Sequence, residues 1–389
     1  MQDKPLECAY ASSGNSSYYR CLQDWARMTV CCLFLGMSAG EGAIAELGPG
    51  FVTLDLTGSG RWDSNPFVNS QQDFEDFIIT SSGRVTYQQN KGIIHLNANA
   101  GVSFNQYIER DDLSHWDPSL SMSVSGPHKD ASSTMDFEFA AGWQTGTSAN
   151  YEVSNRTRSE SVNMNGSVGL QVSDKSGLGL GMTYGDTDYE SESYAASTDY
   201  SGSLSYNLAI SPKLNFQTTG RYRVIEYDIA DLESTTGSVG VVGSISPKLT
   251  GSAAIGLSKA NTTSKAILFY QLDLSWAVDE KRALSITGSR DYSPSAYQTD
   301  SIRSSIGLAL SQRLTESISF SVNSSMGSNE WQGLFDRTDE YIQAGINLAL
   351  KIGKHSRAGL GLDWMDRSSD SGFADYDRIQ ISVSGGTRF

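Results

Sequence analysis

Apolar and polar residues alternate strictly in the last stretch of the chain, residues 376–389, which reads YDRIQISVSGGTRF. The Ile and Val residues of this stretch share one parity, which Phe389 continues, whereas Arg378 and the intervening Gln and Ser residues occupy the other. A repeat of two residues is typical of a β-strand with one apolar and one polar face. The stretch is therefore predicted to be a strand.

The same alternation recurs along most of the chain. In residues 341–352 the apolar side chains again share one parity, and Gln343, Asn347 and Lys351 lie on the other. Eighteen such runs are predicted as strands, at residues 51–62, 77–88, 93–107, 118–125, 133–145, 162–173, 178–185, 199–210, 213–227, 235–245, 248–259, 265–278, 282–290, 302–311, 316–326, 341–352, 356–366 and 376–389.

Short turns and longer polar loops alternate between these runs. The string ISPKL occurs twice, one hairpin apart, with Pro212 and Pro247 supplying the fixed backbone angle that a tight turn favours. The predicted long loops include residues 146–161 and 327–340. This rhythm is typical of an outer-membrane barrel, which has small turns at one end and larger loops at the other.

The composition favours a membrane barrel over a soluble sandwich. Hydrophobic residues make up 38% of the chain, and no run approaches the roughly 18–20 consecutive apolar residues of a transmembrane helix. Gly, Ala and Ser interrupt the apolar parity often, which lipid tolerates better than a packed core does. We therefore expect an all-β fold, a transmembrane antiparallel up-and-down barrel of about 16–18 strands, over residues 46–389.

The first 45 residues differ from the rest of the chain. They contain all four Cys, namely Cys8, Cys21, Cys31 and Cys32, and a short apolar run from Met28. Basic residues precede that run and the small-x-small pattern Ala43-Ile44-Ala45 follows it, as in a secretory signal peptide. Residues 1–45 are thus predicted to be removed, and Met28 is an alternative start. A first buried strand is the other interpretation.

Charge narrows the range of partners. The whole chain has a formal net charge of −15. An acidic protein of this kind is not expected to bind nucleic acid. The expected partners are instead outer-membrane lipid, an exported polysaccharide, and the barrel-assembly machinery, which would recognise the terminal Phe389. The expected location is the bacterial outer membrane.

Charged residues in the middle of strands fall on the polar parity. An Arg on the lipid face at the membrane midplane costs about 2–4 kcal/mol, so these side chains are expected to face the inside of the barrel. The predicted lumen-lining residues are Arg221, Arg223, Arg303, Arg357, Arg378, Asp273 and Asp363.

Catalytic and metal-binding patterns are scarce. None of the four His has metal-ligand spacing with another. His115 with Asp111 and Asp112 is the one candidate for a catalytic group at the rim, and a solvated loop is the favoured interpretation. The acidic segment 366–377 lacks the spaced ligands of a calcium loop. We therefore expect no catalytic residues, no metal and no cofactor, so the protein is not expected to be an enzyme.

Several short strings resemble a known family. From WDSN at residues 62–65 and DFEDFI at 73–78, through SRDYSPS at 289–295 and RTD at 337–339, to DYDR at 375–378, the chain is similar to the putative beta-barrel porin 2 family. The resemblance implies an outer-membrane barrel linked to exopolysaccharide biosynthesis and export. It implies no catalytic residues.

The sequence leaves the function open among three classes. The leading hypothesis is a channel that exports or guides an exopolysaccharide, with inward Arg side chains offering positive charge to sugar acids or phosphates. A general small-solute porin is a variant of it. A non-conducting barrel that acts as a surface scaffold or anchor is the second class, and a rim enzyme is the third.

Overall fold

The computed structural model describes residues 45–389 except 69–73, 128–133, 151–154, 192–193, 230, 264, 296–297, 299, 333–336 and 372–374. The predicted signal segment, residues 1–45, lies outside the described residues apart from Ala45. Among the residues described, no helix has the length and apolar composition needed to cross a membrane.

Eighteen long strands form the wall of one barrel. In chain order they are β2 (Gly50–Asp63), β3 (Asp76–Gln89), β4 (His95–Tyr107), β5 (His115–Gly126), β6 (Met135–Asn150), β7 (Asn155–Ser173), β8 (Ser176–Tyr189), β9 (Ser197–Ser211), β10 (Leu214–Glu226), β11 (Leu232–Ser246), β12 (Leu249–Ala260), β13 (Ile267–Ala277), β14 (Arg282–Ser293), β15 (Asp300–Arg313), β16 (Ile318–Gln332), β17 (Arg337–Ile352), β18 (Ser356–Ser369) and β19 (Tyr376–Arg388).

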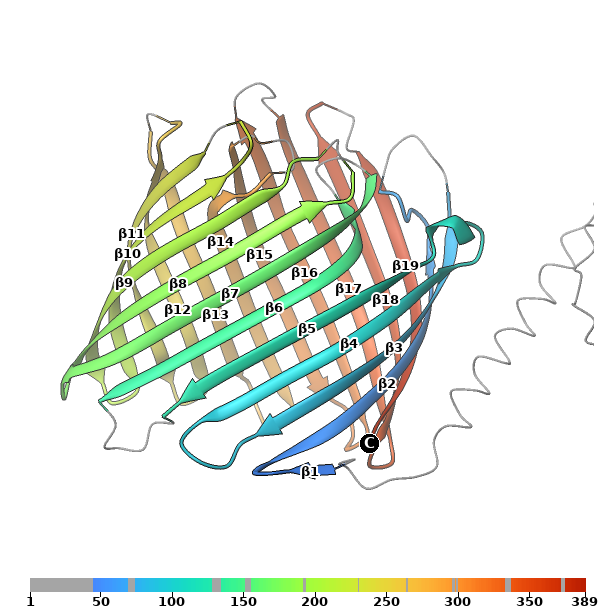
Figure 1. The fold of residues 1–389 in the computed structure, drawn as a ribbon, viewed down its shortest axis with the longest axis horizontal. Helices are drawn as coiled ribbons and strands as arrows, with labels where there is room; N and C mark the ends of the chain where they lie inside the picture. The colour runs from blue at the N-terminus through green and yellow to red at the C-terminus, as the bar shows by residue number, and fades with distance from the viewer. Residues whose placement is uncertain are drawn as a thin grey trace, which may run out of the picture. The chain divides into compact units, whose positions relative to one another are not determined.

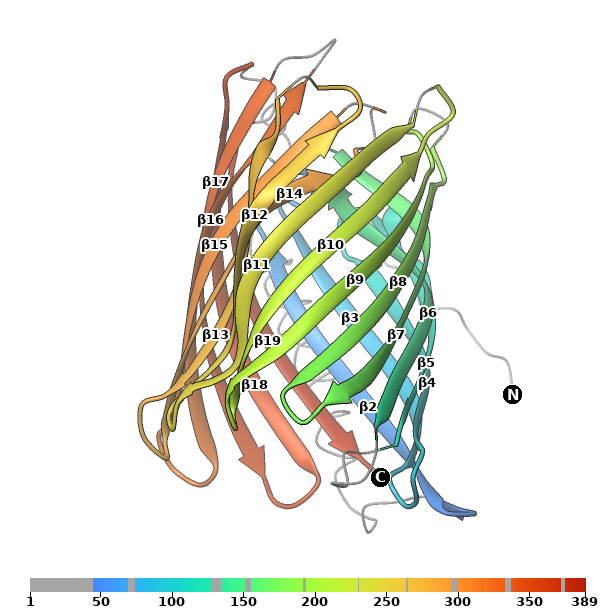
Figure 2. The same ribbon diagram turned by 90° about the vertical axis from the view of Figure 1, so that its left-hand side faces the viewer.

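Each strand pairs antiparallel with the next along the chain, and β19 pairs with β2 to close the barrel. The closing register runs from Gln380 opposite Asp63 to Arg388 opposite Asp55. A short extra strand, β1 (Ala45–Leu47), pairs with the start of β2. Figures 1 and 2 show the strands tilted across the wall, with the C-terminus at the end of the barrel that carries the tight turns. All eighteen predicted strands, and the barrel class, are confirmed.

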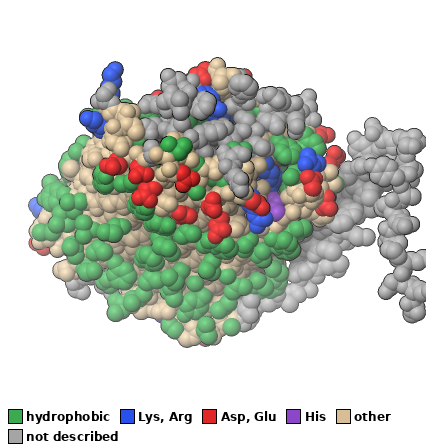
Figure 3. All heavy atoms as spheres, turned by 45° about the horizontal axis from the view of Figure 1, so that its top comes forward, with side chains coloured by type: hydrophobic (Ala, Val, Ile, Leu, Met, Phe, Trp, Pro, Cys, Tyr) green, Lys and Arg blue, Asp and Glu red, His purple; other side chains and the backbone are tan. Residues whose placement is uncertain are grey.

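The outer surface of the wall is apolar, as the parity of the last strand predicts. Ile379, Ile381 and Val383 are 38%, 54% and 49% exposed, so none of them enters a packed interior. Figure 3 shows hydrophobic side chains gathered over the outer wall, with a row of Asp and Glu side chains above them. A closed sheet that presents Ile and Leu outwards satisfies its backbone within the wall and leaves no open edge in lipid.

Two predicted loops are largely strand, which corrects the prediction from sequence. Residues 146–161 were expected to be a loop, but β6 continues to Asn150 and β7 begins at Asn155. Likewise, β16 continues to Gln332 and β17 begins at Arg337, within the expected loop 327–340. Above the membrane both faces of a strand meet polar surroundings, so the sequence no longer alternates between apolar and polar residues. The hydrogen-bonded pairing of the strands nevertheless continues there.

Candidate functional site

The sheet opens between β13 and β14 near the end of the barrel that carries the longer loops. Pairing of β13 with β14 stops at Tyr270 opposite Arg290. Pairing of β14 with β15 nevertheless continues to Ser293 opposite Ser301. The described residues of 291–302, here called the inturned tip, therefore separate from β13, and their contacts show that they turn towards the inside of the barrel.

Apolar packing holds the inturned tip against the inner wall. Tyr292 and Ile302, both 1% exposed, form a buried cluster with Ile225, Leu232 and Ala260 of β10, β11 and β12. These three wall residues lie on the inward-facing parity of their strands, not on the parity that faces lipid. Tyr292 lies on the same parity of β14 as the residues that face lipid nearer the tight-turn end of the strand. It nevertheless packs inside the barrel, because the tip passes to the inner side of the wall where β14 separates from β13.

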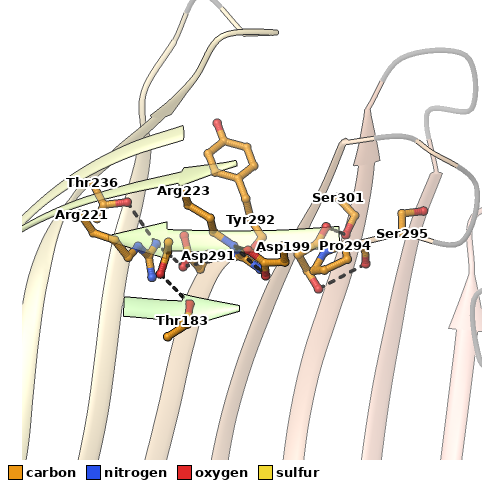
Figure 4. A network of polar contacts seen from close by, with 12 residues as sticks. Thr183, Asp199, Arg221, Arg223, Thr236, Asp291, Tyr292, Pro294, Ser295 and Ser301 are labelled. Carbon is orange, nitrogen blue, oxygen red and sulfur yellow. Dashed lines mark hydrogen bonds and ion pairs between the residues drawn. The ribbon is translucent and has the colours of Figure 1, made fainter. Parts of the chain in front are cut away.

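A polar network lies beside this cluster (Figure 4). Arg221 of β10 donates to Asp291 of the tip, with Nη2 2.5 Å from Oδ2, and to Thr236 Oγ1 at 3.1 Å. Arg223 donates from Nε to both carboxylate oxygens of Asp199, at 2.9 and 3.1 Å, and from Nη1 to the Tyr292 carbonyl at 2.7 Å. Since β10 and β14 are separated by three strands, these contacts cross the inside of the barrel.

A second ionic cluster lies on the inner face of β2, β17, β18 and β19. Arg378 donates from Nε to Asp63 Oδ1 at 2.9 Å, and Gln380 donates to Oδ2 at 2.8 Å. Asp339 accepts a hydrogen bond from Arg337 at 2.9 Å and another from Arg367. Both carboxylates are fully buried. Buried carboxylates of this kind persist only when they are paired with cations and hydrogen-bonded.

A hollow adjoins this cluster on the inner side of β16–β19. Its lining is mainly polar and includes Asn323, Gln343, Asp363, Met365, Arg378 and Gln380. Side-chain amides, a carboxylate and a guanidinium together offer both donors and acceptors, the set that neutral or weakly charged hydroxylated ligands use.

The sheet also opens between β5 and β6. Their pairing stops at Ser119 opposite Gln144, although β6 and β7 remain paired beyond it, to Asn150 opposite Asn155. From this extension Arg156 places its guanidinium carbon 4.3 Å from the centre of the Tyr107 ring on β4. Two hairpins therefore leave their neighbouring strand near the same end of the barrel.

The structure places the seven predicted lumen-lining residues in three settings. Arg221 and Arg223 meet in the network at the inturned tip. Arg378 and Asp363 line the hollow. The remaining three lie on the polar parity of their strands and are exposed, namely Asp273, Arg303 and Arg357.

Their acidic partners were not predicted from the sequence as site residues. Asp63, Asp291 and Asp339 are the carboxylates on which the two clusters depend. Each lies inside one of the short strings that carry the family resemblance, at residues 62–65, 289–295 and 337–339. Those strings were the available signal. Asp199 and Arg367 lie outside them, and no sequence pattern marked either.

The candidate catalytic group at His115 is wrong as it was proposed. Its partner is Asp117, with Nε2 3.1 Å from Oδ2, while Nδ1 lies 2.6 Å from the Leu113 carbonyl oxygen. Asp112 is instead held by Arg110 through two hydrogen bonds of 2.8 Å, which lower the pKa of its carboxyl group. Neighbouring positions in a loop diverge, whereas His115 and Asp117 share one face of β5. Within the described part of the chain, no three His, Cys, Asp or Glu side chains are grouped so as to hold a metal ion.

Comparison with known families identifies one that covers nearly the whole barrel. The profile of the family described as "Putative beta-barrel porin 2" matches residues 47–388. No curated protein matches the sequence significantly.

Several solved structures resemble the barrel at low sequence identity. Pseudomonas aeruginosa OpdQ matches with a TM-score of 0.47 and 9% identity, over 88% of this chain and 100% of its own. OccK3 (OpdO) of the same organism gives 0.46 and 11%, over 87% and 95%. A bacterial polysaccharide outer membrane secretin gives 0.37 and 12%, over 86% and 98%.

Proposed function

The chain belongs to the putative beta-barrel porin 2 family, and from that premise we propose that this porin-like channel of the outer membrane passes or guides an exported polysaccharide. The observation that carries the proposal is the polar hollow inside a closed barrel of eighteen strands. A barrel with 16–18 strands encloses an aqueous channel rather than a packed core.

The chemistry of the hollow suits a glycan. The hollow presents the side-chain amides of Asn323, Gln343 and Gln380. Each amide can both donate hydrogen bonds to hydroxyl groups and accept hydrogen bonds from them. Asp363 adds an acceptor and Arg378 a donor. A chain of sugar residues can exchange such hydrogen bonds one at a time, so that it is guided without being held tightly.

The exposed arginines of the inner face have a second role in this proposal. Arg303 and Arg357 lie on the polar parity near opposite ends of the barrel. Fixed positive charge at both ends attracts sugar acids or phosphates, and the carboxylate of Asp363 limits how strongly such groups are retained.

Solute uptake into liposomes tests the proposal. We expect Asn323→Trp, which fills the hollow, to lower the uptake of oligosaccharides several-fold. The matched control is Ser324→Trp, because Ser324 is the next residue on the same strand and lies on the lipid-facing parity with Leu308 and Met326. Equal uptake by the two variants argues against the hollow as the path.

Planar bilayers separate this function from its alternatives. A conducting wild-type barrel whose current is blocked by added polysaccharide supports the glycan channel. Conductance without such a block supports a general small-solute porin. A barrel that never conducts supports the scaffold, for which the two hairpins that leave their neighbouring strands, at β5–β6 and β13–β14, are the favouring observation.

A further inference from the structure

We propose that the inturned tip is the charge filter of the channel and that Asp291 is the residue that sets its selectivity. The inference rests on the proposed function, since selectivity has a meaning only if the barrel conducts. It goes further by naming the element and the side chain on which ion preference depends.

The ionic network between the tip and the wall is partly accessible to water. The side chains of Arg221, Arg223, Asp199 and Asp291 are 24%, 15%, 23% and 21% exposed. They are therefore close enough to the aqueous path to act on a passing ion, yet sufficiently enclosed that salt screens them less than it screens surface charges.

The tip also covers polar residues that would be exposed to water in an open barrel. Ser234, Thr236 and Ser258, which lie on the inner faces of β11 and β12, are only 2%, 4% and 0% exposed. Phe269 of β13 is 7% exposed, beneath the guanidinium of Arg221 at 5.6 Å. The tip thus occupies space inside the barrel, and it narrows the path on this side.

Asp291 is the acidic residue that both arginines share. Its Oδ2 lies 2.5 Å from Arg221 Nη2 and 3.9 Å from Arg223 Nη1. With Asp199 beside Arg223, two guanidinium groups face two carboxylates. Within this network the charges balance, and removal of the Asp291 charge leaves two cations against one anion, with Arg303 of β15 as a further cation directly opposite Asp291. Such an excess attracts anions into the narrow part of the path.

Other contacts keep the tip seated when that charge is removed. The Ser295 amide donates to the Tyr227 hydroxyl at 2.9 Å, and the Ile229 amide donates to Gln298 Oε1 at 3.2 Å. The apolar contacts of Tyr292 and Ile302 do not depend on charge. Asn at position 291 keeps the shape of Asp and an acceptor oxygen for Arg221, so Asp291→Asn isolates the electrostatic effect.

The first experiment measures the reversal potential in a planar bilayer under a KCl gradient. We expect Asp291→Asn to raise the permeability ratio of chloride to potassium about 3- to 10-fold over the wild type. The control is Asp273→Asn, the same change on the inner face of the neighbouring β13, at an exposed position outside the network. An unchanged ratio in Asp291→Asn, or an equal change in Asp273→Asn, overturns the proposal.

The second experiment tests the position of the tip without requiring conductance. All four natural Cys lie in the first 32 residues, and the parent protein gives the background of thiol labelling. Ser295→Cys, at a 2% exposed position, is expected to react with a charged thiol reagent at least 10-fold more slowly than Ser275→Cys, at an exposed inner-face position of β13.

The two readouts separate the two claims. Equal labelling of both cysteines shows that the tip is not seated and overturns the filter, whether or not the barrel conducts. Protected Ser295→Cys in a barrel that never conducts refutes the channel function and, with it, the assignment of Asp291 as a selectivity residue. Protected Ser295→Cys together with the expected shift in Asp291→Asn supports both claims.

Discussion

Arg378 of the last strand and Asp63 of the first barrel strand are 315 positions apart and form a two-pronged ion pair, with Nε 2.9 Å from Oδ1 and Nη2 2.5 Å from Oδ2. Asp63 is fully buried and also accepts a hydrogen bond from Gln380. The pair lies at the upper end of the β19–β2 seam, where Gln380 is opposite Asp63. It therefore fastens the strand pairing that closes the barrel.

Removal of this buried pair should weaken the closed barrel. We expect Asp63→Asn to lower the free energy of unfolding by about 3 kcal/mol, because it leaves the largely buried Arg378 guanidinium without its counter-charge. Unfolding in urea, followed by fluorescence in lipid vesicles, measures the change. The control is Asp55→Asn, which removes the partner of the 60% exposed Arg388 on the same seam, and here we expect a loss below about 1 kcal/mol. Equal losses would falsify the special role of the buried pair.

The two faces of β19 should respond oppositely to charge. Ile381→Arg places a guanidinium on the outer, lipid-facing surface and should destabilise the inserted barrel by about 2–4 kcal/mol. Ser384→Arg introduces the same side chain on the polar parity of the same strand and should be nearly neutral. The amount of folded protein in the outer membrane and its unfolding midpoint provide the measurement. A larger loss in Ser384→Arg contradicts the assignment of the faces.

A backbone constraint in β12 should not tolerate a side chain. Gly251 has φ +143°, and a Cβ atom there would lie 1.9 Å from the Asp273 carbonyl oxygen. Gly251→Ala is expected to cost about 1–3 kcal/mol, since strain at such a position has that size. Gly202→Ala is the control, because a Cβ at Gly202 meets nothing within 4 Å. Thermal unfolding of the two variants in one detergent distinguishes them, and equal midpoints would count against the constraint.

The terminal Phe389 should matter for assembly more than for stability. Its backbone exchanges two hydrogen bonds with Leu54, at 2.8 and 3.0 Å, and these do not depend on its side chain. If the assembly machinery recognises the aromatic ring, Phe389→Ser lowers the amount of barrel in the outer membrane several-fold in cells. Purified variant and wild type then unfold at the same urea concentration. A normal amount of the Phe389→Ser barrel in the outer membrane would show that the assembly machinery does not recognise this ring.

Local patterns predicted the strands and their faces well, as β17 and β19 show. Ile342, Ile346 and Ile381 lie on the predicted apolar parity and are exposed on the outer wall. The reason is that lipid and water impose the same two-residue alternation on each strand, whatever its partner. Prediction was poorer where the lipid ends, as in the extensions of β6 and β16 that had been expected to be loops.

The sites depended on contacts that no local pattern encodes. Arg221 and Arg378 were predicted to face inwards, but their partners Asp291 and Asp63 lie 70 and 315 positions away. The carboxylate partner of His115 was expected to be Asp111 or Asp112 in the loop. The structure shows that the partner is Asp117, which lies on the same face of the strand.

Alternation along the chain was therefore sufficient for the strands and the membrane-facing side of the wall, and short strings such as those at residues 62–65 and 289–295 were sufficient for the resemblance to the family. The tertiary structure alone decided that Tyr292 and Ile302, which continue the lipid-facing parity of β14 and β15, pack inside against Ile225 and Leu232. Parity specifies a face only while a strand stays in the wall. Where β14 leaves β13 above Arg290, the burial of each face depends on which distant strands the freed hairpin meets, and that relationship exists only in the closed barrel.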